Sequence, residues 1–169
     1  IENAGGNGVT WESSASGVGV TGNVIKSPVN SGVSVSAGSP SIDSNAIENA
    51  GKYGVVWTSS SSGGYVRLNI VKSPVLSGVS VSAGSPLVKS NTIENALEHG
   101  IRWWSNGGNN VESNVIKSPR YRGISIHVGN PVIKSNTVEG AGTDAIFLDT
   151  GVLASTVVES NVVKGRVGC

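Results

Sequence analysis

The sequence predicts an all-β protein that forms a single parallel β-helix of about seven turns, each of 21–25 residues. Apolar residues recur along the chain at constant gaps of five, eight and two residues. An Asn also recurs three residues after the first apolar position of each unit. No stretch sustains the apolar period of a helix over roughly 11 residues or more. A constant repeat through residues 1–169 is typical of a solenoid, in which each unit stacks on its neighbours.

Four apolar positions define each unit. The first is Val20, Ile42, Val66, Val88, Val111, Ile133 and Val158. The second is Ile25, Ile47, Val71, Ile93, Ile116, Val138 and Val163, with Ile1 as the remnant of an earlier turn. The third is Val9, Val33, Val55, Val79, Ile101, Ile124 and Ile146. The fourth is Trp11, Val35, Trp57, Val81, Trp103, Ile126 and Leu148. A gap of two is strand periodicity, and stacked strands lie about 4.8 Å apart, so we expect four buried columns.

Two further columns are predicted to support the scaffold. The recurring Asn residues are Asn23, Asn45, Asn69, Asn91, Asn114, Asn136 and Asn161. We expect their side-chain amides to hydrogen-bond from turn to turn. We also expect these residues to lie at corners with a left-handed backbone conformation, which Asn tolerates. The residue after the second apolar position alternates in charge: Glu2, Lys26, Glu48, Lys72, Glu94, Lys117, Glu139 and Lys164. Alternation places opposite charges side by side, which favours register control over catalysis.

Composition excludes several partners and leaves the ends of the chain open. The net charge is +1, and Lys and Arg are not pooled in one run, so we predict no nucleic-acid partner. No apolar run approaches the ~20 residues of a membrane span, so we predict no membrane insertion. We also predict no cofactor and no metal site, and the single Cys169 cannot close an internal disulfide. Because Ile1 starts in mid-repeat, we expect a piece of a longer chain, with adjoining domains or end-to-end self-association at its ends.

The units GVSVSAGSPSIDSNAIENA and GISIHVGNPVIKSNTVEGA resemble a known repeat. They are similar to the right-handed parallel β-helix repeat of the pectate-lyase-like superfamily, particularly its NosD-like carbohydrate-binding and sugar-hydrolase group. The resemblance covers essentially all 169 residues and implies the fold. It implies no single activity, because that superfamily includes lyases, hydrolases, epimerases, adhesins and binding scaffolds. We find no copy of a family catalytic motif, so no catalytic residue follows from the resemblance.

The outward positions beside the third and fourth columns change character along the chain. They are Thr10, Glu12, Ser34, Ser36, Val56, Thr58, Ser80 and Ser82 in the first four turns, and Arg102, Trp104, Ser125, His127, Phe147 and Asp149 in the last three. Trp104, His127 and Asp149 should line up on consecutive turns, about 4.8 Å apart. Loops of variable length at 12–19, 58–65, 104–110 and 149–157 should project from the neighbouring edge.

A stacking aromatic, an imidazole, a carboxylate and guanidinium groups together favour a site for an acidic or neutral saccharide. The candidate ligand-binding residues are Arg102, Trp104, Tyr121, Arg122, His127, Phe147 and Asp149. As an alternative, His127, Asp149 and Arg122 could act in a polysaccharide lyase, epimerase or glycoside hydrolase, with His127 abstracting a proton. The same residues could instead cap the stack.

We expect a secreted or cell-surface module, hence an extracellular one, with a structural or adhesive role and a polysaccharide as its partner. A self-assembling filament subunit is the other alternative. Near-identical units such as SGVSVSAGSP at 31–40 and 77–86 favour these structural roles.

Overall fold

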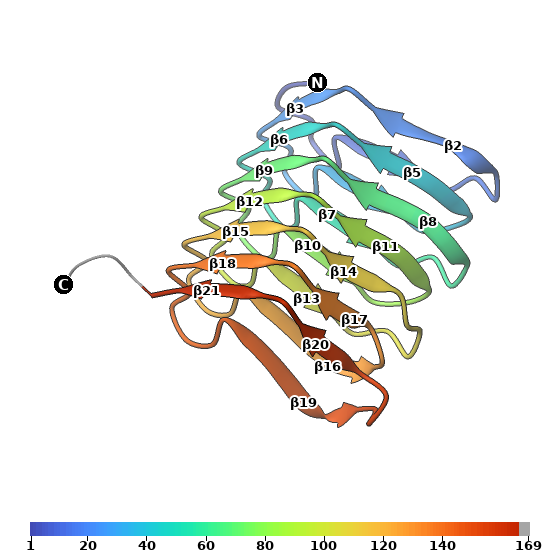
Figure 1. Cartoon of the computed structure of the whole chain (residues 1–169). Helices are drawn as coiled ribbons and strands as arrows, with labels where there is room; N and C mark the ends of the chain where they lie inside the picture. The colour runs from blue at the N-terminus through green and yellow to red at the C-terminus, as the bar shows by residue number, and fades with distance from the viewer. Residues whose placement is uncertain (166–169) are drawn as a thin grey trace.

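The computed structural model describes residues 1–165 as a stack of seven turns with three strands in each turn (Figure 1). The strands form three seven-stranded sheets. Sheet 1 contains β1 (Val9–Trp11), β4 (Val33–Val35), β7 (Val55–Trp57), β10 (Val79–Val81), β13 (Ile101–Trp103), β16 (Ile124–Gly129) and β19 (Ile146–Val152). Sheet 2 contains β2 (Ser16–Thr21), β5 (Ser39–Asp43), β8 (Ser62–Arg67), β11 (Ser85–Lys89), β14 (Asn110–Glu112), β17 (Val132–Lys134) and β20 (Val157–Glu159). Sheet 3 contains β3 (Val24–Lys26), β6 (Ala46–Glu48), β9 (Ile70–Lys72), β12 (Thr92–Glu94), β15 (Val115–Lys117), β18 (Thr137–Glu139) and β21 (Val162–Lys164).

Every strand pairs in parallel with its copy one turn away, which confirms the predicted fold. The pairing register joins equivalent positions of the repeat, as in Val79 opposite Ile101 and Ile93 opposite Ile116. Residues 1–165 contain no helix, and therefore none that is long and apolar enough to cross a membrane. The predicted position of Cys169 lies outside the described residues.

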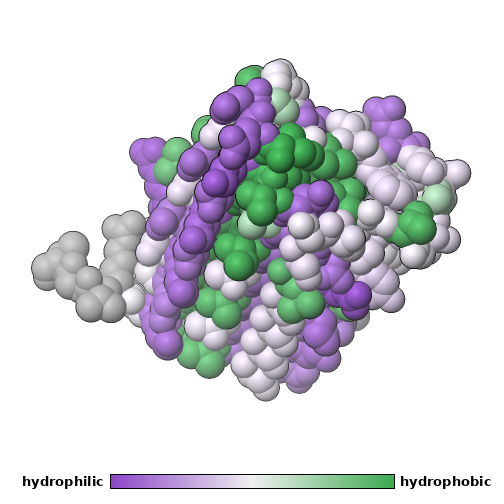
Figure 2. All heavy atoms as spheres, turned by 90° about the horizontal axis from the view of Figure 1, so that it is seen from above, coloured by the Kyte–Doolittle hydropathy of each residue, from purple (hydrophilic) through white to green (hydrophobic). Residues whose placement is uncertain are grey.

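The four predicted apolar columns form the core. In the middle turns, all four columns are fully buried, as one residue from each column shows: Ile42, Ile47, Val79 and Trp57. The end turns differ, since Leu148, Val158 and Val163 belong to the same columns but are 42–59% exposed. Figure 2 looks onto the other end and shows apolar residues there between rows of hydrophilic ones. Self-association through the ends stays a prediction.

The Asn column is a continuous hydrogen-bond ladder. The backbone N–H and the Nδ2 of Asn45 both donate to Oδ1 of Asn69, at 3.0 Å each, and Nδ2 also donates to the carbonyl of Val20. The same bonds recur up to Asn161. One detail of the prediction was wrong, because the left-handed residue is the one before each Asn: Gly22, Ser44, Leu68, Ser90, Ser113, Ser135 and Ser160. The Asn itself must aim its N–H along the stack, so the sharp bend falls one residue earlier.

Alternating charges lie side by side, as predicted. Glu48 is opposite Lys72 in the register, and Lys117 and Glu94 approach to 3.3 Å. A second outward column holds the most enclosed ion pairs, in which Glu112 accepts from both Lys89 and Lys134. The hydrogen bond from Lys89, followed by those from Lys134 and Asn110, lowers the pKa of Glu112 to about 2 against the opposing effect of burial.

The connections between sheets 1 and 2 alternate in length. Longer ones at 58–61 and 104–109 flank the short connection 82–84. The predicted loops are partly strand, since β2 begins at Ser16, β8 begins at Ser62 and β19 continues to Val152. A short connection between two longer ones leaves a recess at this edge of the solenoid.

Candidate functional site

Two neighbouring tryptophans in β13 and just after it show how sheet 1 separates scaffold from surface. Trp103 points inward and is 0% exposed, whereas Trp104 points outward and is 47% exposed. Successive side chains of a strand point to opposite faces, so one residue of difference changes the role of the side chain. The indole N–H of Trp103 donates to the carbonyl of Ser105, which leaves this ring with no polar atom to offer a ligand.

The structure brings Trp104, His127 and Asp149 together on consecutive turns, as the repeat register predicts. The ring centroids of Trp104 and His127 are 4.3 Å apart with an interplanar angle of 29°, which is a stacked pair. Nδ1 of His127 lies 3.0 Å from Oδ2 of Asp149. The backbone N–H of Thr150, followed by the His127 hydrogen bond, lowers the pKa of Asp149. The three side chains therefore form one contiguous group on the outer face of sheet 1.

Ser125 completes this group and was not among the predicted site residues. Its Oγ lies 3.1 Å from Nε2 of His127, so both ring nitrogens of the imidazole have protein partners. The order serine, histidine, aspartate is that of a nucleophilic triad. Ser125 is 0% exposed, however, so a substrate carbonyl has no approach to its hydroxyl. The geometry instead fixes the imidazole with one face against Trp104. The spacing of two between Ser125 and His127 on one strand is the signal that could have identified this partner.

The two predicted arginines of this face differ in how far they are already engaged. Arg122 pairs with Asp144 at 3.2 Å, lies 3.4 Å from Ser125 Oγ, and stacks its guanidinium 3.4 Å from the ring centroid of Phe147. Arg102 lies over the ring of Trp104, at 5.0 Å from the centroid, and makes no ion pair with any residue in 1–165. Arg102 is therefore the less engaged guanidinium of the two, whereas Arg122 is held by Asp144, Ser125 and Phe147.

The corner before sheet 1 adds Tyr121 and an unpredicted residue, His99. Tyr121 is 45% exposed, with the guanidinium of Arg120 at 5.6 Å and the ring of His99 at 6.4 Å from its own ring. Burial, followed by the charges of Arg122 and Arg102, lowers the pKa of His99 to about 4. Its Nδ1 is buried without a hydrogen-bond partner among the described residues. His99 lies outside the strands, so the strand pattern gave no reason to select it.

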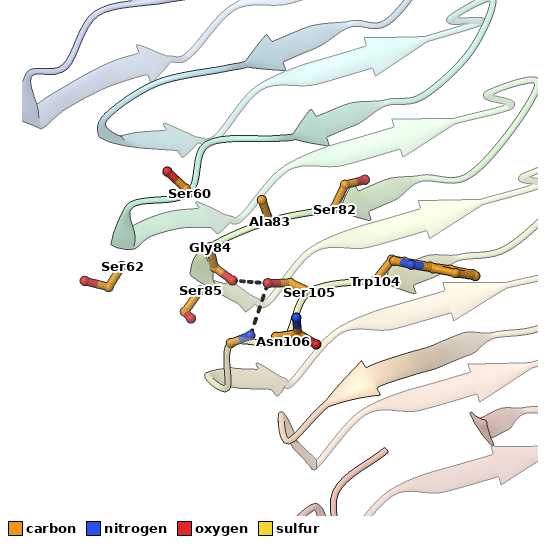
Figure 3. A pocket seen from close by; sticks show the side chains of 10 residues that line it. Ser60, Ser62, Ser82, Ala83, Gly84, Ser85, Trp104, Ser105 and Asn106 are labelled. Atoms are coloured by element: carbon orange, nitrogen blue, oxygen red, sulfur yellow. Dashed lines mark hydrogen bonds between the residues drawn. The ribbon is translucent and has the colours of Figure 1, made fainter. Parts of the chain in front are cut away.

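A polar pocket of about 320 Å³ opens at the recess beside Trp104 (Figure 3). Its lining residues are Ser60, Ser62, Ser82, Ala83, Gly84, Ser85, Trp104, Ser105, Asn106 and Gly107. The Ser105 hydroxyl donates to the carbonyl of Gly84 and accepts from the N–H of Gly107, which ties the longer loop to the shorter one. A Cβ at position 107 would collide with Ser85 Oγ and the Gly84 carbonyl, so this close approach requires glycine. Sequence reasoning placed loops at this edge but did not identify the pocket.

Across residues 1–165, no group of His, Cys, Asp and Glu side chains is arranged to hold a metal ion. The chemistry available at the site is aromatic stacking at Trp104 and hydrogen bonding by hydroxyl, amide and guanidinium groups.

Comparison with known proteins gives one match. The family described as right handed beta helix region matches residues 31–169. No curated protein and no solved structure matches the chain.

Proposed function

Because the chain belongs to the right-handed β-helix family, a fold that hosts unrelated functions, we propose from its side chains that it is a saccharide-binding module. The ligand is a polysaccharide, and the binding surface is the outer face of sheet 1 around Trp104. The module belongs to a secreted or cell-surface protein, where such a surface would serve a structural or adhesive role.

The observation that carries this proposal is the exposure of Trp104 on a rigid support. An indole that is 47% exposed on a regular strand face offers a flat apolar surface for the C–H face of a sugar ring. His127 lies against Trp104 and is itself held by Ser125 and Asp149, so the indole needs little ordering on binding. Arg102 adds N–H donors beside the ring.

Three features support binding over catalysis at this face. Both nitrogens of His127 are hydrogen-bonded within the protein, Asp149 accepts from Thr150 and contacts His127, and Arg122 is paired with Asp144. A general base needs a nitrogen within reach of the substrate proton. The resemblance of the repeats to the pectate-lyase-like superfamily supports a saccharide as the ligand but no reaction.

A glycan array that includes neutral, uronate and sulfated oligosaccharides tests the proposal. Wild-type protein should bind at least one class, and Trp104→Ala should lose that binding while keeping the wild-type unfolding midpoint. His127→Ala provides the comparison for catalysis, since an enzyme would lose turnover and keep most of its affinity. Absence of binding by the wild type to every glycan, with Trp104→Ala indistinguishable from it, would contradict the proposal and leave the group as a cap of the stack.

A further inference from the structure

The recess beside Trp104 arises because the connections between sheets 1 and 2 alternate in length from one turn to the next. The connections 58–61 and 104–109 are longer than 82–84, which lies between them. The short connection therefore forms the floor of the pocket and the two longer ones form its walls (Figure 3). Three consecutive turns contribute, so the recess spans about 9.6 Å along the stack, twice the usual distance between neighbouring strands.

The lining of the pocket is polar but uncharged. Of its ten residues, none has an ionisable carboxylate, amine, guanidinium or imidazole. Within residues 1–165, the side chains of Ser60, Ser62, Ser82, Ser85 and Asn106 make no hydrogen bond to another protein group. Four hydroxyls and one amide therefore have unused donors and acceptors. The late-turn polar groups are the opposite case, because His127 is bonded to Ser125 and Asp149, and Arg122 is paired with Asp144.

The pocket is continuous with the exposed indole. His127, on the following turn, covers one face of the Trp104 ring, and the Arg102 guanidinium lies 5.0 Å from the ring centroid. Figure 3 shows the ring edge-on at the level of its own strand, with Ser82 on the side of the preceding turn. A sugar ring that stacks on Trp104 from that side would lie over Ser82, and the next unit of the chain would reach the hydroxyls of the pocket.

From this arrangement we propose that the recess is a subsite for an uncharged, hydroxyl-rich sugar unit, so that the ligand of the module is a neutral polysaccharide. The ligand extends from Trp104 toward the N-terminal turns and away from His127 and Asp149. This inference rests on the function proposed above and makes it more specific. An anionic unit would need cationic donors that the pocket does not contain.

The chain offers a matched control for this subsite. The segment Ser82 to Ser85 reads SAGS, and the same four letters occur two turns earlier at 36–39. Ser82 and Ser36 are both exposed at equivalent positions, but the residue on the following turn is Trp104 for Ser82 and Thr58 for Ser36. Ser82→Leu should fill the floor of the recess, whereas Ser36→Leu makes the same change where no exposed aromatic is present.

Isothermal titration with cellohexaose, xylohexaose, mannohexaose and a galacturonate hexamer measures the effect. At least one neutral hexasaccharide should bind wild-type protein more tightly than the galacturonate hexamer does. Ser82→Leu should raise the Kd for that neutral sugar about tenfold, as expected when one or two hydrogen bonds are lost, while Ser36→Leu leaves it unchanged. Asn106→Ala should also raise the Kd for that sugar, although this variant removes an amide and adds no bulk.

Three outcomes would overturn the inference, and they are distinguishable. Tighter binding of the galacturonate hexamer than of every neutral sugar would contradict the ligand class. Wild-type affinity in Ser82→Leu and Asn106→Ala, with loss in Trp104→Ala, would remove the recess from the site but keep the proposed function. If the wild type bound none of the sugars in this experiment or on the array, the proposed function would fail as well.

Discussion

The outer face of sheet 1 differs between its first four turns and its last three, although the interior behind it is the same. Behind both halves, the apolar columns keep their spacing, and they are buried in all turns between the first and the last. Outside, the Ser, Thr and Val residues of the early turns give way to Arg102, Trp104, His127 and Asp149. In a solenoid each turn contacts only its neighbours, so the outward residues of one turn can change without disturbing the core. The difference indicates that the interior specifies the fold, and in the proposed function the late outer face carries the binding residues.

The largest effect should come from emptying an interior position. Trp57 is fully buried, and Trp57→Ala should lower the free energy of unfolding by about 3–5 kcal/mol through lost burial and the remaining cavity. Urea denaturation followed by circular dichroism measures this change. Trp104→Ala is the outward control and should change the unfolding free energy far less. Equal losses of unfolding free energy in Trp57→Ala and Trp104→Ala would contradict the assignment of Trp57 to the core and Trp104 to the surface.

A smaller loss is expected in the Asn ladder, which is buried but polar. Asn91 donates to Asn114 and Val66 and accepts from Asn69. Asn91→Leu removes the bonds made by the side-chain amide, keeps only the one donated by the backbone N–H, and leaves buried partners unsatisfied, which should cost on the order of 1–3 kcal/mol. The exposed loop residue Asn106 serves as the control, since Asn106→Leu should leave the urea midpoint unchanged. A wild-type midpoint in Asn91→Leu would show that the ladder does not stabilise the fold.

Acid sensitivity should localise to the enclosed ion pair of sheet 2. The pKa of Glu112 is held at about 2, below its usual value of 4.5, so its contribution to stability is present above pH 4.5 and is lost as the pH falls toward 2. Glu112→Gln should therefore be less stable than the wild type at pH 7, and the difference should disappear near pH 2. Thermal unfolding at a series of pH values checks this. Glu12→Gln, at an outward position with no ion pair among the described residues, should show no such convergence.

A second pH-dependent effect is predicted at the corner of the late turns. Burial and the neighbouring arginines hold the pKa of His99 at about 4, so the unfolded chain binds the proton more readily between pH 4 and 6.5. The contribution of His99 to the free energy of unfolding is fully present above pH 6.5 and decreases as the pH falls toward 4. His99→Phe should remove that part of the pH dependence, and an NMR titration of the His99 ring protons measures the pKa directly. A titration midpoint near pH 6.5 for the His99 ring in the folded protein would contradict this prediction and show that the ring is exposed to water.

The sequence predicted the parts of this structure that depend on periodicity. Interior columns, the Asn ladder, the charge alternation and the alignment of Trp104 with His127 and Asp149 all follow from counting residues in a stack. Burial of Ser125 beneath its neighbours could not be predicted, because it depends on where the long side chains of Arg122 and Phe147 come to rest. The left-handed corners and the recess depend on backbone angles and loop paths, and similar angles are adopted by residues as different as Ser44 and Leu68.

The central claim, that the late outer face binds while the interior only supports it, is tested most directly by the indole N–H signals in an NMR titration. The indoles of Trp11, Trp57 and Trp103 donate to backbone carbonyls within their own turns, whereas that of Trp104 has no partner among the described residues. During titration with the oligosaccharide that binds most tightly on the array, the Trp104 signal should shift most, and the signal of Trp11, on the first turn, should stay in place. A Trp104 signal that does not move at saturating ligand would contradict the account.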